Sequence, residues 1–259
     1  MSDKLKFDGL DLSRVEEAGL NGLQTQRQLF YDGWLLRVSP GKAKRARSVN
    51  AHFGSTLPLA QKIPYCERIY TERGLPVLFR ITPFLQPRNL ETELETRGYE
   101  SFENTLVQLT RLEYPPEEPM VPGVDFMTPT PAAFAEAVGE LQETSTEQRA
   151  AYLERMLHTP LTTRAVIAVM DGRPVGTGTV MLEDGLAGVF TMGTAPDVRA
   201  RGIATGLLAM MLRWAWEHGA SHAYLQVSAD NHRAISVYRK FGFVDAYTYH
   251  YRGRPGECH

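Results

Sequence analysis

The chain has 259 residues, of which 43% are hydrophobic and 22% charged, and its formal net charge is -2. That apolar fraction can build a hydrophobic core, so the composition excludes general disorder, and the length allows one large domain or two of ordinary size. A net charge near zero argues against a protein whose affinity for nucleic acid depends on neutralising phosphates. No apolar run has membrane-spanning length, and the first residues lack the apolar stretch of a secretory signal. We therefore expect a cytoplasmic protein with no nucleic acid and no membrane among its partners.

The two cysteines, Cys66 and Cys258, are too few for a disulfide scaffold. We expect both to be free thiols in a reducing compartment, with Cys66 a half-buried helix residue rather than a nucleophile. The histidines and cysteines show no metal-ligand spacing such as His-Glu-x-x-His or Cys-x-x-Cys. The sequence therefore predicts no metal site.

The first half of the chain predicts helices and strands in alternation. Residues 59–73 are helix-like and end at Gly74, although Pro64 must kink this helix or mark its true start. A strand at 76–81, a helix at 89–96 and, after Gly98-Tyr99, a strand at 105–112 follow.

A proline-rich segment divides the chain into two halves of comparable size. Residues 114–123 hold four prolines, which do not fit inside helices or central strands, and acidic residues keep the segment solvated. We therefore predict a first domain at 1–113, a linker at 114–123, a second domain at 124–252 and a short tail at 253–259.

The second half has clearer patterns. It predicts two helices at 130–139 and 144–158, strands at 165–170, 175–182 and 186–194 joined by Asp-Gly turns, a long apolar helix at 202–218, and then a strand at 222–228, a helix at 231–240 and a strand at 243–251. An antiparallel meander followed by a β-α-β unit predicts an α/β fold, with a mixed sheet and helices on both of its faces.

The order helix–Gly–strand–helix–Gly–aromatic–strand occurs in both halves at nearly the same spacing. In the first half it runs from residue 59 to 112. In the second half it starts with the long helix that ends at Gly219 and continues through the strand at 222–228 and the helix at 231–240 to Gly242-Phe243. This pattern favours a diverged internal duplication. The alternative is a chance similarity between two β-α units, which are common.

The stretch from Arg199 to Thr205 carries the strongest chemical signal. A strand runs into a short Arg/Gly loop that opens a long helix, where the first backbone N–H groups have no intrahelical partner and favour an anion. Gly202 lets the main chain approach a phosphate, and Ala204 keeps the next approach narrow. Arg199 and Arg201 add positive charge beside it. The pattern indicates a pyrophosphate site, whereas the alternative is an ordinary helix start with solvated arginines.

Two motifs together resemble the GNAT superfamily of N-acetyltransferases. Residues 199–204, Arg-Ala-Arg-Gly-Ile-Ala, are similar to its Arg/Gln-x-x-Gly-x-Gly/Ala loop, with Ala204 in place of the commoner glycine. Downstream, Asn231, Ala234, Tyr238 and Gly242-Phe243 match its Asn-x-x-Ala-x-x-x-Tyr-x-x-x-Gly-Phe pattern. The resemblance covers about residues 124–252. It implies a GNAT fold in this half and, if the repeat is real, a degenerate GNAT-like first half.

The resemblance implies acetyl-CoA as cosubstrate, bound where the strands at 186–194 and 222–228 splay apart. The residues it assigns to acetyl-CoA are Met192, Gly193 and Thr194 for the pantetheine arm, Arg199, Ala200, Arg201, Gly202, Ile203, Ala204 and Thr205 for the pyrophosphate, and Asn231 for the cofactor arm. The backbone N–H of Met192 would polarise the thioester carbonyl. Tyr238 would protonate the departing thiolate. Two simpler interpretations remain open, in which Tyr238 is a packing residue and Asn231 a helix cap.

No general base stands out in the sequence, and direct attack needs only a neutral amine. The candidates are Glu140, Glu143, Glu183, Asp184, His222 and Asp230. The first half lacks an Arg-x-x-Gly-x-Ala loop, so we expect it to hold no working cofactor site. Its strand-like runs at 32–37 and 45–50 either wall an acceptor cleft or show the alternation of a half-exposed sheet.

We therefore expect an acetyl-CoA-dependent N-acetyltransferase that acts on a small-molecule or peptide amine by direct attack. The alternative from another class is a non-catalytic acyl-CoA-binding sensor. The sequence does not identify the acceptor or the oligomeric state.

Overall fold

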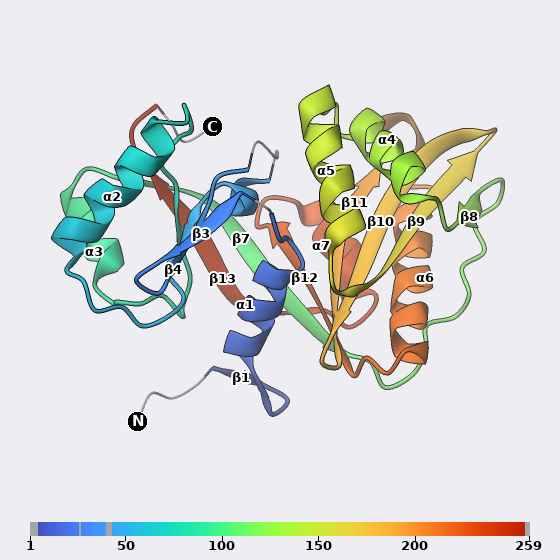
Figure 1. The fold of residues 1–259 in the computed structure, drawn as a ribbon. Helices are drawn as coiled ribbons and strands as arrows, with labels where there is room; N and C mark the ends of the chain where they lie inside the picture. Colours follow the sequence, from blue (N-terminus) through green and yellow to red (C-terminus); the bar gives the residue numbers. More distant parts are fainter. Residues whose placement is uncertain (1–4, 26, 40–42, 257–259) are drawn as a thin grey trace. The chain divides into compact units, whose positions relative to one another are not determined.

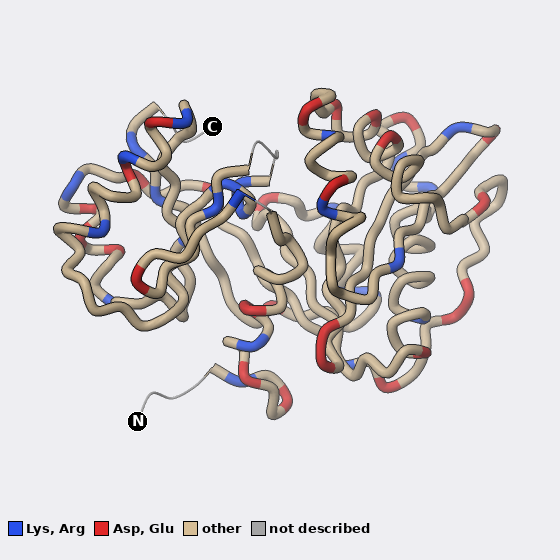
Figure 2. Tube along the Cα trace, viewed as in Figure 1, with Lys and Arg blue, Asp and Glu red and all other residues tan. Residues whose placement is uncertain are grey.

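A computed structural model describes residues 5–25, 27–39 and 43–256, so Cys258 lies outside the described residues. The chain forms two compact units, which are Met1–Gly22, Val107–Val227 and Asn231–Ala246 for unit 1, and Leu23–Leu106, Ser228–Asp230 and Tyr247–His259 for unit 2 (Figure 1). Acidic and basic residues are interspersed along both units rather than gathered by sign (Figure 2).

Unit 1 is built on a mixed sheet. Its strand order is β7-β12-β11-β10-β9-β8, in which β11 and β12 are parallel and the pairs β11/β10, β10/β9 and β9/β8 are antiparallel. The strands are β7 (Glu100–Arg111), β8 (Asp125–Met127), β9 (Thr162–Met170), β10 (Arg173–Glu183), β11 (Leu186–Thr194) and β12 (His222–Ser228). The chain turns between β9, β10 and β11 at Asp171-Gly172 and Asp184-Gly185, all four with the positive φ that tight hairpins need.

Helices cover both faces of this sheet (Figure 1). The helices of unit 1 are α1 (Leu12–Asn21), α4 (Pro131–Leu141), α5 (Thr146–His158), α6 (Ile203–Glu217) and α7 (His232–Arg239). Phe134 and Val138 of α4 pack on Ala165 and Ile167, which face one side of β9. On the other side, a Cβ at Gly176 of β10 would lie 2.9 Å from Ile203 Cγ2 and from Leu207 Cδ1, so glycine lets α6 approach the sheet closely.

Unit 2 has a smaller sheet in the order β3-β4-β5-β6-β13, with β5 and β6 parallel and the other pairs antiparallel. Its elements are β3 (Gln28–Tyr31), β4 (Trp34–Arg37), β5 (Val49–Asn50), α2 (Leu59–Thr71), β6 (Phe79–Ile81), α3 (Leu90–Thr96) and β13 (Val244–Gly253). One apolar cluster joins Trp34 and Phe79 of the sheet to Ile63 and Tyr70 of α2. Cys66 is fully buried in this cluster, and burial raises the pKa of its thiol to about 12, which makes it a poor nucleophile.

The same succession of elements occurs twice. The run β3-β4-β5-α2-β6-α3-β7 matches the run β9-β10-β11-α6-β12-α7-β13, and β5/β6 and β11/β12 are both parallel pairs. Gly74 and Gly219 end the first helix of each run, Gly98 and Gly242 follow the second, and all four have positive φ. This agreement supports the predicted repeat. That unit 2 is a degenerate GNAT-like copy stays a prediction.

The last strand of each run contributes residues to both units. β13 pairs with β6 through His250, Tyr251 and Arg252 in unit 2, and β7 lies next to β12 in unit 1. The units are therefore interleaved along the chain, whereas the sequence divides it once, at residues 114–123. Sequence periodicity predicts that a segment is a strand but does not identify its partner strand. It therefore does not predict that β13 pairs with β6 or that β7 lies next to β12.

The predicted fold class is confirmed, and the bounds of β11 and β12 agree with the prediction. Three differences concern the ends of elements and short pieces. Helix α2 begins at Leu59 and continues through Pro64, which is therefore not its start. Strand β6 is limited to three residues, and the short elements β1 (Lys6–Phe7), β2 (Leu10–Asp11), α1 and β8 were not predicted.

Candidate active site

Strands β11 and β12 pair over only part of their length. The parallel register runs from Leu186↔His222 to Val189↔Leu225, yet β11 continues to Thr194 and β12 to Ser228. Residues 186–190 are buried, whereas 191–194 are only partly buried. On the β10 side, β11 stays paired to its end. Within the described ranges, residues 192–194 therefore have no strand partner on their β12 side, which is the edge that the sequence assigned to a pantetheine arm.

A β-bulge interrupts β11 at the point where this open edge begins. The register with β10 passes from Thr179↔Phe190 to Thr177↔Gly193, so two residues of β11, Thr191 and Met192, stand opposite Gly178 alone. Thr191 has a φ of +56°, and left-handed conformations are disfavoured for β-branched residues, at a cost of order 1–3 kcal/mol. The sequence did not predict this bulge.

The side chain of Met192 lies on the α6 face of the sheet. A Cβ at Gly178 would lie 3.0 Å from Met192 Sδ and 2.6 Å from Met211 Cε of α6. Glycine at 178 therefore makes room for two methionine side chains beneath the bulge.

The β11–α6 loop forms an open and uncapped helix start. Gly202 precedes α6 with a φ of +85° and no side chain caps the helix, whose first backbone bond is Gly206 N–H to Gly202 C=O at 2.9 Å. The N–H groups of Ile203, Ala204 and Thr205 therefore lack intrahelical partners. A Cβ at Gly202 would meet nothing closer than Val121 Cγ2 at 3.8 Å, so the space in front of this glycine is free for an anion.

The charged side chains of this loop are exposed. Arg199 and Arg201 are both exposed, and the Nη1 of Arg201 donates to Met170 Sδ at 3.4 Å. Asp197 is held by Arg173 at 2.5 Å, and this hydrogen bond lowers the pKa of the carboxyl. The carboxylate beside the loop is thus paired with a cation, which leaves the arginines to determine the local charge.

Tyr238 and Asn231 belong to α7, which follows β12, the other splayed strand. Tyr238 is 7% exposed, its ring centroid lies 6.1 Å from that of Phe243, and burial raises the pKa of its phenol to about 12. No group in the described part of the chain forms a hydrogen bond with its hydroxyl. Asn231 Oδ1 accepts from Ala234 N at 3.1 Å, so Asn231 caps α7, and its role toward the cofactor arm stays a prediction.

The candidate bases lie either far from the splayed end or in solvent. Glu183, Asp184 and His222 sit at the opposite end of the sheet, where β10, β11 and β12 are still fully paired. The other three are exposed, namely Glu140, Glu143 and Asp230. Among the described residues, no group of three or more His, Cys, Asp or Glu side chains is placed to hold a metal ion.

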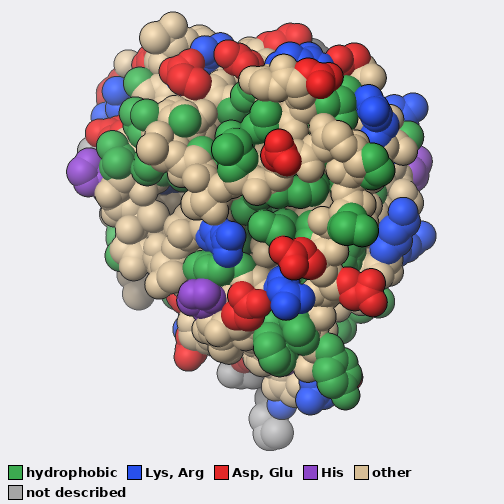
Figure 3. Space-filling model, turned by 90° about the vertical axis from the view of Figure 1, so that its right-hand side faces the viewer, with side chains coloured by type: hydrophobic (Ala, Val, Ile, Leu, Met, Phe, Trp, Pro, Cys, Tyr) green, Lys and Arg blue, Asp and Glu red, His purple; other side chains and the backbone are tan. Residues whose placement is uncertain are grey.

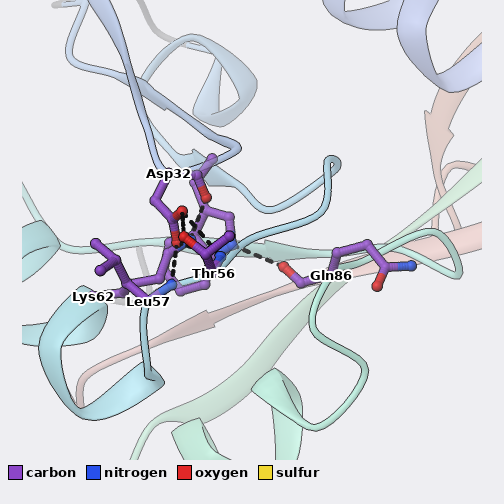
Figure 4. A network of polar contacts seen from close by, with 6 residues as sticks. Asp32, Thr56, Leu57, Lys62 and Gln86 are labelled. Carbon is purple, nitrogen blue, oxygen red and sulfur yellow. Dashed lines mark hydrogen bonds and ion pairs between the residues drawn. The ribbon is translucent and has the colours of Figure 1, made fainter.

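The corresponding loop of unit 2 differs in its chemistry. Eight residues, 51–58, join β5 to α2, and eight residues, 195–202, join β11 to α6. Pro58 precedes α2, whereas Gly202 precedes α6. The carboxylate of Asp32 accepts hydrogen bonds from the backbone N–H of Thr56 at 3.0 Å and of Leu57 at 2.8 Å (Figure 4).

A buried lysine completes this network in unit 2. Lys62 of α2 is fully buried, its Nζ lies 3.0 Å from Asp32 Oδ2 and 4.0 Å from the Trp34 ring centroid, and Trp34 Nε1 donates to the Gln86 carbonyl. The Leu57 amide and the Lys62 ammonium hold the pKa of the Asp32 carboxyl well below its usual range. An anion supplied by the chain itself therefore binds the amides before α2, where unit 1 leaves its helix start open.

Comparison with known proteins agrees with this geometry. Residues 128–243 match the model of the acetyltransferase (GNAT) family, so this part of the chain is a GNAT-family domain. An uncharacterized N-acetyltransferase of Bacillus subtilis, YobR, is 26% identical over 247 residues, which are 93% of this chain and 98% of that protein. A mycothiol acetyltransferase of Clavibacter sepedonicus is 40% identical over 76 residues, which are only 25% of its length.

Solved structures share the fold over most of the chain. A GCN5-related N-acetyltransferase from Kribbella flavida covers 94% of this chain with a TM-score of 0.68 and 20% identity. A tandem GNAT protein from the clavulanic acid biosynthesis pathway covers 80% of this chain with a TM-score of 0.62 and 16% identity. In the part of the chain that the structure describes, no helix has the length and apolar composition to cross a membrane.

Proposed function

We propose that this chain, which carries a GNAT-family domain at residues 128–243, transfers an acetyl group from acetyl-CoA to a primary amine. The observation that carries the proposal is the coincidence of two open features at the end of β11. The edge of residues 192–194 has no strand partner, and the helix start at Gly202 is uncapped and open. An elongated ligand with an amide-containing arm and a pyrophosphate fits both features.

The residues present fit the two polar parts of CoA. Backbone groups of Met192, Gly193 and Thr194 bind the pantetheine arm as an added strand would be bound. The loop from Arg199 to Thr205 binds the pyrophosphate through backbone N–H groups, the positive end of the helix dipole and two arginines. When bound, acetyl-CoA supplies the activated acetyl group.

The backbone N–H of Met192 is the donor that stabilises negative charge on the thioester oxygen. Preorganisation supports this role, because the bulge fixes the backbone just before Met192. The neutral amine attacks the thioester carbon directly, so that no acyl-enzyme forms. The nitrogen then gives up its extra proton to water, and the C–S bond breaks to leave the amide and the CoA thiolate.

Tyr238 is the general acid that donates its phenolic proton to the departing thiolate. Burial raises the pKa of Tyr238 to about 12, so the proton is retained throughout the physiological range. The thiol of the departing CoA has an ordinary pKa near 8.5. The raised phenol pKa makes Tyr238 a weaker acid than usual, so its hydroxyl first stabilises the leaving thiolate by a hydrogen bond. The proton then passes to sulfur, and the phenol regains a proton from solvent.

The acceptor must arrive as a neutral amine or lose its proton to water. Each candidate base lies in solvent or at the paired end of the sheet. We therefore expect the rate to rise with pH as the acceptor ammonium loses its proton, and to level off above the pKa of the acceptor.

One cofactor site per chain follows from the comparison of the two loops. The amides before α2 are bound by Asp32, and Pro58 takes the place that Gly202 holds before α6. Unit 2 then serves a role other than cofactor binding.

The test is release of the CoA thiol from acetyl-CoA in the presence of a panel of amines, with small molecules in one arm and peptides in the other. Release that depends on a particular amine, together with its acetylated product, supports the enzyme. Tight acetyl-CoA binding with no release for any amine would favour the non-catalytic acyl-CoA sensor instead.

A further inference from the structure

Four hydroxyl groups gather beside the bulge of β11, on the face of the sheet that α4 and α5 cover. The hydroxyl of Tyr152 lies 3.1 Å from Thr191 Oγ1 and 3.4 Å from Thr179 Oγ1. Thr177 Oγ1 donates to the Thr191 carbonyl at 3.0 Å. We refer to Tyr152, Thr177, Thr179 and Thr191 as the hydroxyl cluster.

The hydroxyl cluster holds Thr191 at two points. Its side chain is hydrogen-bonded to Tyr152, and its carbonyl accepts from Thr177. Thr177 and Thr179 are fully buried, so water competes little for these bonds. A β-branched residue with a φ of +56° persists only where its surroundings determine it, and these contacts supply that constraint.

Tyr152 connects the bulge to α5, which is joined to α4 by the Arg149–Glu136 ion pair. None of the residues of α5 is buried, and Tyr152 and Met156 are the side chains of α5 that pack on the apolar cluster of α4 and β9. The Tyr152 ring centroid lies 6.0 Å from that of Phe134, and the Arg155 guanidinium lies 4.5 Å from the ring. The ring is thus held from two sides while its hydroxyl reaches Thr191.

We propose that Tyr152 is a positioning residue for acetyl transfer, acting through Thr191 on the backbone N–H of Met192. This inference rests on the proposed function, because it assigns that N–H to the thioester oxygen. The peptide plane that carries the Met192 N–H begins at the carbonyl of Thr191, so the conformation of residue 191 aims this donor. A donor that is wrongly aimed lowers the rate of the chemical step more than it weakens cofactor binding.

The first experiment removes one hydroxyl and keeps the ring. Tyr152→Phe lowers kcat by about 10- to 100-fold, while the Kd for CoA changes by less than about 2-fold. Tyr114→Phe is the matched control, because Tyr114 is 80% exposed, and it leaves both constants unchanged. An unchanged kcat in Tyr152→Phe would overturn the proposal.

A second background separates positioning from general damage to the fold. Glycine adopts positive φ at little cost, so Thr191→Gly removes the need for the constraint. In that background, Tyr152→Phe lowers kcat by less than about 3-fold, whereas in the Thr191→Ser background, which keeps the hydroxyl, the full loss returns. Equal losses in the glycine and wild-type backgrounds would show that Tyr152 acts by another route.

A structural measurement keeps this inference distinct from the proposed function. If the wild-type protein acetylates no amine, the proposed function fails, but crystal structures of the variants still report the backbone at residue 191. The proposal requires residue 191 to leave positive φ in Tyr152→Phe and to keep it in the combined Thr191→Gly and Tyr152→Phe variant. Retention of positive φ in Tyr152→Phe contradicts it.

Discussion

Gly202 and Pro58 occupy equivalent positions, because each directly precedes a helix that is reached from a parallel strand through eight residues. Gly202 has a φ of +85° and open space where a Cβ would stand. Pro58 has a φ of -67° and no N–H group, and the amides just before it bind the Asp32 carboxylate. The amides just before α2 are therefore bound by a carboxylate of the chain itself, whereas the start of α6 is open to an external anion.

Replacement of Gly202 tests the open helix start. Gly202→Val places a side chain in the space assigned to the pyrophosphate, so acetyl-CoA should no longer raise the melting temperature of the protein. Gly219→Val is the matched control, because Gly219 ends the same helix with a φ of +86° and no atom near its Cβ position. Both variants carry similar backbone strain, but only Gly202→Val should abolish the cofactor-induced shift. A shift that survives in Gly202→Val would refute the phosphate assignment.

Tyr238→Phe tests the general acid. The variant keeps the buried ring and removes the proton, so we expect kcat to fall about 10- to 1,000-fold with little change in the Kd for acetyl-CoA. Stability should change little, because no described group is hydrogen-bonded to the lost hydroxyl. Full turnover in this variant, under conditions where chemistry limits the rate, would make Tyr238 a packing residue.

The Asp32 network makes unit 2 sensitive to acid. The folded chain holds the pKa of Asp32 below that of the unfolded chain, which is about 3.9. The unfolded state therefore binds more protons near pH 4, so the stability from Asp32 is present above this pH and lost as pH falls below it. Urea unfolding at several pH values should show a loss between pH 5 and 3 that is smaller in Asp32→Asn. Equal losses in both proteins would exclude this carboxylate as the cause.

Gly178→Ala tests the space under the bulge. The new Cβ would lie 2.6 Å from Met211 Cε and 3.0 Å from Met192 Sδ, so both methionine side chains must move. Because these are flexible ends, we expect a stability cost of only about 1–3 kcal/mol, together with slower acetyl transfer. In the Gly178→Ala background, Met211→Ala should restore part of the lost stability and part of the lost rate of acetyl transfer. Denaturant unfolding measures the stability, and kcat measures the rate of acetyl transfer. An unchanged kcat would mean that catalysis does not depend on the exact position of Met192.

The fold was largely predictable because its signals are local. The Asp-Gly turns at 171–172 and 184–185 and the apolar period of α6 determine where these elements begin and end. The positions of β7 next to β12 and of β13 next to β6 were not predictable, because they depend on pairing between segments far apart in the chain. The same holds for Asp32 and Lys62, which lie 30 residues apart and meet only in the folded unit.

The open helix start at Gly202 was predictable, because it depends on backbone chemistry at fixed spacing, and its role as a pyrophosphate site stays a prediction. Thr191 gave no signal, because a threonine inside an apolar strand predicts regular extended backbone rather than a bulge. The contribution of Tyr152 was hidden for the same reason, since a tyrosine on a helix usually predicts packing alone.

Calorimetric titration of the wild-type chain with acetyl-CoA tests the central claim most directly, because it counts the sites and measures their affinity together. The account predicts saturation at one acetyl-CoA per chain, at the end of β11, since in unit 2 Asp32 already binds the amides just before α2 and Pro58 stands where α6 has Gly202. Saturation at two per chain, or no binding at all, would contradict it.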